Sequence, residues 1–400
     1  MVDFGGLWLT SFGPMELTQD GLAVSGHYVN RGHRCPIVGT VVGERLRFRY
    51  EEPTEQGTGW FELLRHGKFH GGYTPEGATH EGTWSGQREF DGIWDSSFGR
   101  LRLIQEDARM FGFYEGVGSS TIEGEIVDGE FRFQYQEPQA AGEGKFVIDP
   151  GFQSFTGEWR PLGSERWLPW VGKRVSPKSN VTWLLVLEAH WQRSIAEQEF
   201  SFGRMLAEFL NRHEHLEVRH RFFDDAVSLD RWCRELLYFP EPAVVLVASH
   251  GTPEGINVQG RTIDSKRVID SLRYAENLML LHFSACLVMK EEEEGDFAKR
   301  IQNAAPFPIS GYTTSVDWGG SAVLEFNYLD MILSKGLPPA KAAEYLLKLV
   351  KYAGDSVPEG SPYPPAGFRF FSPSGKMTSS FDEPSLDELP PPAMNELFLA

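Results

Sequence analysis

The chain has few cysteines, a deficit of basic residues and no long hydrophobic run. Three cysteines, Cys35, Cys233 and Cys286, form no disulfide framework and suit a reducing compartment. Lys and Arg number 38 against 56 Asp and Glu, which gives a formal net charge of −18 and disfavours nucleic acid and anionic membranes as partners. The N-terminus lacks a basic and apolar leader, and no stretch reaches the length of a membrane span. We therefore expect a cytoplasmic protein.

The first half of the chain contains an internal repeat. Residues 6–28 and 92–114 match at an offset of 86, with Trp8 against Trp94, Gly13 against Gly99 and further pairs along both segments. Matches of rare residue types at one fixed offset indicate a duplication, with copies at about 4–90 and 91–170.

Each copy alternates apolar and polar residues, as in 46–50 and 131–135, and this period of two predicts strands with one buried face. Glycine-containing turns such as 19–21 and 127–129 predict hairpins. Residues 1–174 are expected to be antiparallel β, with two meanders that close into one pseudo-symmetric barrel or form two packed half-barrels. The aromatic and glycine residues mostly suit a core, and the alternative is a mouth or seam that binds a small ligand or a protein segment.

Beyond residue 181 the pattern changes to alternating strands and helices. Strands are expected at 181–187, 216–223, 243–248, 278–283 and 307–312, and helices at 197–213, 229–238, 264–274, 296–304 and 321–352. Such alternation predicts a mostly parallel sheet covered on both faces, so the fold class is α+β multidomain, with an α/β domain at 181–354. Residues 355–400 are rich in proline and are expected to be partly disordered, apart from a short strand at 367–371.

Two predicted strands end in residues that can do chemistry. The strand at 243–248 is followed by His250 and Gly251, and the strand at 278–283 by Ser284 and Cys286. Parallel strands end at one edge of a sheet, so these side chains are expected to meet there. A thiol beside an imidazole is a nucleophile with its base, whereas the structural alternative is a buried cysteine and an ordinary turn histidine.

The order of these motifs resembles the caspase-like cysteine peptidase superfamily, and most closely its bacterial CHAT-type peptidases. The segments at 308–312, 315–318 and 335–343 also follow the order of those proteins, and the resemblance covers only 181–352. It implies a Cys286–His250 dyad that cleaves protein or peptide substrates, with an oxyanion hole formed by the backbone N–H groups of Gly251 and Cys286. It implies no cofactor and no metal.

The same resemblance suggests where specificity and control lie. Glu188, Asp317, Trp318 and Ser284 fall where this fold builds its specificity pocket, and the acidic residues favour Lys or Arg before the cut. The Glu291–Glu294 run follows the nucleophile and is a candidate for self-cleavage. Relatives often carry a second domain as a gate, which makes the β module a candidate sensor for a small, nucleotide-like activator, with a role in antiphage defence.

Two alternatives stay open at this stage. One is a catalytically inactive peptidase-like scaffold whose β module is the ligand- or protein-binding sensor. The other is a different cysteine hydrolase or acyltransferase on a similar sheet.

Overall fold

The computed structural model describes residues 2–373 and 377–378, apart from 65–66, 107, 116–119, 193, 195, 199, 292–296 and 306. The chain divides into two compact units. The first comprises residues 1–177 and 237–240, and the second comprises 178–236 and 241–400. Each unit is described by itself.

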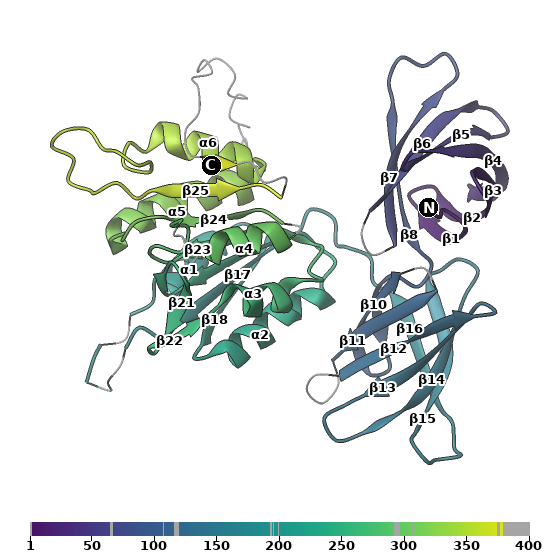
Figure 1. The fold of residues 1–400 in the computed structure, drawn as a ribbon, viewed down its shortest axis with the longest axis horizontal. Helices are drawn as coiled ribbons and strands as arrows, with labels where there is room; N and C mark the ends of the chain where they lie inside the picture. Colours follow the sequence, from purple (N-terminus) through teal and green to yellow (C-terminus); the bar gives the residue numbers. More distant parts are fainter. Residues whose placement is uncertain are drawn as a thin grey trace, which may run out of the picture. The chain divides into compact units, whose positions relative to one another are not determined.

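The first repeat forms a complete antiparallel barrel. Its strands are β1 (Gly6–Thr10), β2 (Gly13–Asp20), β3 (Ala23–Asn30), β4 (His33–Val42), β5 (Arg45–Glu51), β6 (Gln56–Leu64), β7 (Lys68–Pro75) and β8 (Gly82–Arg88). Each strand pairs with the next, and β8 returns to β1 with Arg88 opposite Trp8. The barrel is the purple and blue one in Figure 1.

The second repeat forms a second complete barrel. Its strands are β9 (Gly92–Ser96), β10 (Gly99–Glu106), β11 (Arg109–Tyr114), β12 (Ser120–Val127), β13 (Glu130–Gln136), β14 (Ala141–Ile148), β15 (Ser154–Pro161) and β16 (Leu168–Arg174). It closes between β16 and β9. Both predicted arrangements, one shared barrel and two half-barrels, are therefore wrong. Each repeat contributes eight strands, and eight are enough to close a barrel whose side chains fill it.

Aromatic side chains fill both barrels in the same way. Trp84 and Trp170, which are 86 positions apart, are each 2% exposed and pack edge-on against Phe12 and Phe98. The guanidinium of Arg88 lies 3.9 Å from the ring centre of Trp8, and that of Arg174 lies 4.2 Å from that of Trp94. Repeated contacts of this kind confirm the duplication. Large buried rings occupy the inward positions of each barrel, so each barrel interior is a packed hydrophobic core.

The second unit is built on a mixed sheet, as the alternation of elements predicts. Five strands are parallel: β17 (Thr182–Ala189), β18 (Leu216–Phe223), β19 (Ala243–Ala248), β23 (Leu278–Ser284) and β24 (Ile309–Tyr312). Two strands, β25 (Phe368–Phe371) and β26 (Met377–Thr378), add antiparallel at one side. The order across the sheet is β18-β17-β19-β23-β24-β25-β26.

Helices cover both faces of this sheet (Figure 1). One core joins the strands to α1 (Phe202–Leu210), α5 (Trp318–Leu333) and α6 (Pro339–Leu349). The other face carries α2 (Ala226–Arg234), the short 3-10 helix η1 (Glu235–Tyr238), α3 (Ser265–Leu272) and α4 (Phe297–Ala304). Side chains of β23 point to both faces of the sheet. Leu280 belongs to the core with α1, α5 and α6, whereas Phe283 packs on Phe297 of α4.

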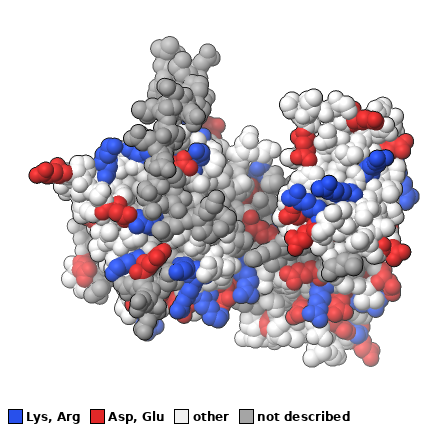
Figure 2. Space-filling view, turned by 45° about the horizontal axis from the view of Figure 1, so that its top comes forward, with Lys and Arg blue, Asp and Glu red and all other residues white. Residues whose placement is uncertain are grey.

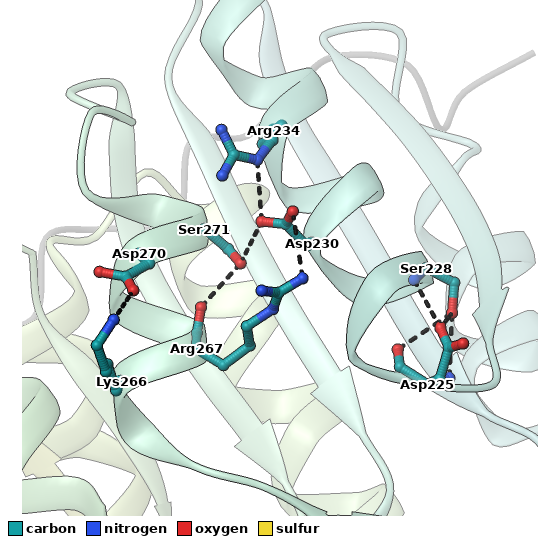
Figure 3. A network of polar contacts seen from close by, with 8 residues as sticks. All are labelled: Asp225, Ser228, Asp230, Arg234, Lys266, Arg267, Asp270 and Ser271. Carbon is teal, nitrogen blue, oxygen red and sulfur yellow. Dashed lines mark hydrogen bonds and ion pairs between the residues drawn. The ribbon is translucent and has the colours of Figure 1, made fainter. Parts of the chain in front are cut away.

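Helices α2 and α3 are joined by a polar network centred on Asp230 (Figure 3). Its carboxylate accepts hydrogen bonds from the Ser271 hydroxyl at 2.7 Å and the Arg234 guanidinium at 3.0 Å, and Arg267 lies 3.6 Å away. The network holds α2 against α3.

Several predicted boundaries differ from the structure for local reasons. The expected helix at 321–352 is two helices, because Gly336 adopts a φ of 69° and Pro338 and Pro339 follow it. The helix expected at 229–238 begins earlier, at Ala226, because Asp225 caps it and shares a capping box with Ser228, the third helical residue. The sequence analysis also missed a small antiparallel sheet, β20 (His250–Thr252), β21 (Gly255–Val258) and β22 (Arg261–Ile263). The strand expected at 367–371 is β25, whereas most of the proline-rich segment falls outside the described residues.

None of the helices in the described part of the chain is long and apolar enough to cross a membrane.

Candidate functional site

The candidate site lies at the carboxyl edge of the parallel strands in the second unit. Strands β17, β19 and β23 are parallel neighbours, so the residues that follow Ala189, Ala248 and Ser284 leave the sheet at one edge. From β17 the chain runs outward to β18, and from β19 it runs the other way to β23. Open sheets of this type bind ligands where the strand order reverses in this way.

The ends of β19 and β23 are in direct contact. The backbone N–H of Ser249 donates to the carbonyl of Ser284 at 3.2 Å. A Cβ placed on Gly251 would lie 2.2 Å from the carbonyl oxygen of Cys286, so only glycine fits at this position. The structure thus places Gly251 against the backbone of Cys286, with His250 next to it in the chain, at the edge that the sequence analysis singled out.

Cys286 differs from the other two cysteines in its surroundings. It is partly exposed, whereas Cys35 and Cys233 are buried. Burial raises the pKa of both buried thiols, that of Cys233 to about 12, which keeps them protonated at neutral pH. The Sγ atom of Cys286 lies 3.8 Å from the carbonyl of Val316, in the loop before α5.

The backbone turns sharply directly after Cys286. Leu287 has a φ of 64°, a left-handed conformation that side chains other than glycine and asparagine rarely adopt. Its N–H donates to the carbonyl of Thr314 at 3.2 Å, which holds the turn against the loop that follows β24. Backbone strain of this kind is often found where a reactive side chain must be presented.

His250 begins β20 and is exposed, with an aromatic neighbour. The ring centre of Trp191, which follows β17, lies 5.0 Å from that of His250 with the two planes at 85°. The Trp191 indole N–H donates to the Glu188 carboxylate at 2.8 Å. A carboxylate beneath the sheet edge therefore holds the indole that borders the imidazole.

Glu188 occupies a different place from the one expected of a substrate-facing acid. It is fully buried and accepts hydrogen bonds from Trp191, Ser201, His220 and the backbone N–H of Phe202. Burial alone would raise the pKa of Glu188, but the hydrogen bonds from His220, Ser201 and Trp191 lower it on balance. Its oxygens are engaged by internal donors, so it positions neighbouring groups.

Asp317 and Trp318 lie on the surface at the start of α5. Asp317 is exposed and caps the helix, accepting from the backbone N–H of Gly320 at 3.0 Å. Trp318 is 45% exposed and packs edge-on against Trp191 at 4.6 Å and Phe200 at 4.9 Å between ring centres. Together these residues form an aromatic rim that runs from α5 to His250.

The positions of Ser284 and of the Glu291–Glu294 run say little about specificity or self-cleavage. Ser284 is partly buried and its carbonyl is used in the contact with Ser249. Glu291 is described, but Glu292, Glu293 and Glu294, the rest of the proposed self-cleavage run, lie outside the described residues. The search of the described residues found no group of three or more His, Cys, Asp and Glu that could hold a metal ion.

Sequence reasoning missed Trp191 as part of this site. The signal was available, because Trp191 follows the buried strand β17 by two residues just as His250 follows β19 by two. The sequence analysis weighed Glu188 at the end of this strand and did not consider Trp191.

Comparisons with known proteins identify no family for this chain. No protein-family model matches it, and no curated protein matches it. Among solved structures, a transferrin-binding protein B double mutant from Haemophilus parasuis Hp5 is 12% identical, with a TM-score of 0.16 over 42% of this chain and 44% of that one. Intact Ap-TbpB is 13% identical, with a TM-score of 0.16 over 42% and 45%.

A third structure, from a study of two prolyl endopeptidases, is 10% identical, with a TM-score of 0.19 over 85% of this chain and 82% of that one. This chain spans less than half the length of the two transferrin-binding proteins. At these scores the likenesses carry no argument about fold or function.

Proposed function

We propose that the second unit is a caspase-like cysteine endopeptidase with Cys286 as nucleophile and His250 as its acid–base partner. The observation that supports this proposal is the contact between the two strand ends, in which Gly251, the neighbour of the exposed His250, packs against the backbone of the partly exposed Cys286. A thiol and an imidazole at a strand edge are the groups that nucleophilic amide cleavage requires.

In the proposed reaction the Cys286 sulfur, as thiolate, attacks the carbonyl carbon of a peptide bond. The thiol proton passes to His250, and the backbone N–H groups of Gly251 and Cys286 stabilise the oxyanion. Collapse of the tetrahedral intermediate breaks the C–N bond, and the amine leaves with the proton from His250. Water then hydrolyses the thioester and restores the thiol.

We propose that a basic residue precedes the cut. The exposed carboxylate of Asp317 next to the exposed indole of Trp318 supports this preference, because a carboxylate and an aromatic face together attract ammonium and guanidinium groups. Glu188 does not enter this pocket directly, since its oxygens already accept hydrogen bonds from within the fold. The barrels are proposed to recruit substrate or partners from their outer faces, because their interiors are packed with aromatic side chains.

The test is cleavage of a fluorogenic peptide library by the purified chain beside Cys286→Ala and His250→Ala, with Cys35→Ala as the matched cysteine control. We expect both site variants to lose on the order of a thousandfold or more in rate, as removal of a nucleophile or its base does elsewhere, with Cys35→Ala close to wild type. Peptides with Lys or Arg before the cut should dominate the cleaved set.

If neither the wild type nor Cys35→Ala cleaves any peptide, the result would favour the inactive scaffold. Cleavage that survives Cys286→Ala would contradict the proposed nucleophile. Reaction of Cys286 with small acyl donors but with no peptide would favour a different cysteine hydrolase or acyltransferase.

A further inference from the structure

The outer face of the first barrel contains a basic groove within an otherwise acidic chain. The groove has a volume of about 680 Å³ and is open to solvent. Its polar lining includes three arginines of β5 at every second position, Arg45, Arg47 and Arg49, which all point away from the barrel core. Basic side chains form a row on the barrel side of the view in Figure 2.

Pairing between strands fixes what stands beside each arginine. Arg47 lies opposite Thr40 on β4 and Trp60 on β6, and Arg49 lies opposite Val38 and Thr58. The groove is thus a strip across neighbouring strands in which hydroxyl groups, an indole and an exposed valine flank the guanidinium groups.

Two of the three arginines have no acidic partner among the residues that the structure describes. Arg45 pairs with Glu62 at 2.7 Å and covers the Trp60 ring at 4.6 Å. Arg47 and Arg49 are exposed and make neither an ion pair nor a side-chain hydrogen bond within the described part of the chain. Their five donors each remain available to an incoming anion.

The second barrel provides an internal comparison, because the matching positions there hold acidic residues, ion-paired cations and one glutamine. Thr40, Arg47 and Trp60 correspond to Glu125, Arg132 and Lys145, which lie opposite one another in the same way. Likewise, Val38, Arg49 and Thr58 correspond to Glu123, Gln134 and Glu143. Arg132 pairs with Glu130 at 2.7 Å, and Lys145 pairs with Glu158 at 3.0 Å. The duplication therefore conserved the cores, and the outer faces carry opposite charge.

We propose that this groove binds an extended acidic segment of a protein partner. Arginines at alternate positions of a strand are roughly 7 Å apart, which is also the spacing of alternate side chains in an extended peptide. Acidic side chains at every second residue would therefore meet Arg47 and Arg49 in register, in the bidentate geometry that guanidinium and carboxylate share.

Two features favour a peptide over other anions. The carboxylates of Glu62 and Glu81 border the groove, so the basic strip is short, which disfavours a continuous phosphate backbone. A shallow open groove exposes most of a bound small molecule, whereas pockets for small ligands usually enclose them. Binding must also use side chains, since a closed barrel offers no free strand edge to extend.

The proposal does not depend on the peptidase activity, so it is tested in the full chain carrying Cys286→Ala, which prevents cleavage of the probe. The probe is a fluorescent peptide of alternating glutamate and serine, and its control has the same residues in two blocks. Binding is followed by fluorescence anisotropy at low and at physiological salt.

The alternating peptide should bind, the block peptide should bind at least about fivefold more weakly, and added salt should weaken both. Arg47→Glu with Arg49→Glu should lower the affinity by about tenfold or more, because two charged contacts become repulsive. Arg47→Gln with Arg49→Gln should lower it by less. Arg132→Glu, at the matching position of the second barrel, should change it less than about twofold.

Three results would overturn the proposal. Equal binding of the alternating and block peptides would remove the argument from spacing. An equal loss in Arg132→Glu would make the attraction nonspecific. Tighter binding of a thymidine oligonucleotide or of ATP, or no peptide binding at millimolar concentration, would reject an acidic peptide as the occupant.

Discussion

The closed barrels and the open edge of the sheet surround cysteine differently. Cys35 lies on a strand of a closed barrel and is 1% exposed, whereas Cys286 follows a strand of an open sheet and is partly exposed. In a small closed barrel every inward position belongs to the core. At the carboxyl edge of a parallel sheet, the side chains that follow the strands leave the core together.

The difference shows where function can reside in each unit. The barrels repeat their interiors, including the edge-on contact of Phe12 with Trp84 and of Phe98 with Trp170, and differ on their outer faces. In the sheet unit the exposed side chains able to do chemistry, His250 and Cys286, lie at the strand ends. Recognition is therefore expected on barrel surfaces and chemistry at the sheet edge.

The largest effect should come from removing a barrel's central tryptophan. Trp84→Ala should destabilise the first barrel by about 3–5 kcal/mol, because it deletes a buried ring around which other rings pack. Hydrogen exchange should accelerate in β1–β8 and remain unchanged in β17–β24. Trp170→Ala should do the same to β9–β16, and a similar response of both barrels to either variant would show that they do not behave as separate repeats.

The sheet unit should respond to its buried polar group as strongly as the barrels do to their rings. His282 is fully buried on β23, with Nδ1 2.8 Å from the Ser310 hydroxyl and Nε2 3.5 Å from the buried Glu325 carboxylate. His282→Leu should destabilise this unit by about 3 kcal/mol, because the buried Glu325 carboxylate would lose its nearest nitrogen and the Ser310 hydroxyl its hydrogen-bond partner. The measurement is proteolysis in urea.

The double variant His282→Leu with Glu325→Leu provides the control for that prediction. It removes both members of the pair, so it should cost less than the sum of the single variants. Simple additivity would mean that the two side chains are independent.

A smaller effect is expected at the aromatic border of the site. Trp191→Ala should lower kcat/KM about tenfold, or about 1.4 kcal/mol, because it removes the ring that borders His250. Trp191→Phe keeps a ring and should lose less than about threefold, and the pH profile of the alanine variant should move with the altered surroundings of His250. If Trp191→Ala changes only the stability and leaves the pH profile unchanged, Trp191 contributes to packing and does not position His250.

The smallest expected effect is the contribution of Glu188 to the free energy of unfolding and its loss at low pH. Its folded pKa lies below the ordinary value of 4.5, so its hydrogen bonds stabilise the fold above that pH, and this stability is lost as pH falls through the folded value. Glu188→Gln should therefore be less stable than wild type by about 1 kcal/mol near pH 7, because its hydrogen bonds weaken, and the gap should narrow as the pH falls below the ordinary carboxyl pKa. The measurement is urea unfolding across pH, and exposed Glu359→Gln should behave like wild type throughout.

The periodicity of the sequence predicted most strands and helices, whereas it did not predict how the strands pair into barrels and small sheets. The strands 216–223 and 243–248 and the contact between the strand ends at Gly251 and Cys286 follow from alternation and from the geometry of parallel strands, and the duplication follows from the matches at one offset. Closure of each repeat into its own barrel depends on the number of strands that pair, which local patterns count poorly. The hairpin sheet of β20–β22 escaped because its strands are only three or four residues long.

The candidate site was predicted in its reactive residues and missed in its surroundings. Glu188 appeared as a substrate-facing acid because it follows apolar residues, but its fate depends on His220 and Ser201, which lie far along the chain. Trp191 stands two residues beyond β17 as His250 stands beyond β19, but its contact with His250 joins residues 59 positions apart. Long-range hydrogen bonds of this kind leave no periodic signal in the sequence.

The most direct test of the proposed Cys286–His250 pair is covalent trapping in the native chain. The folded protein is treated with a peptidyl electrophile that carries Lys before its reactive group, and the labelled cysteine is identified by mass spectrometry in wild type and His250→Ala. The pair predicts stoichiometric labelling of Cys286 in wild type, a large loss in His250→Ala, and no labelling of the buried Cys35 and Cys233. Labelling of Cys286 that is equally fast without His250, or that ignores the peptide, would contradict it.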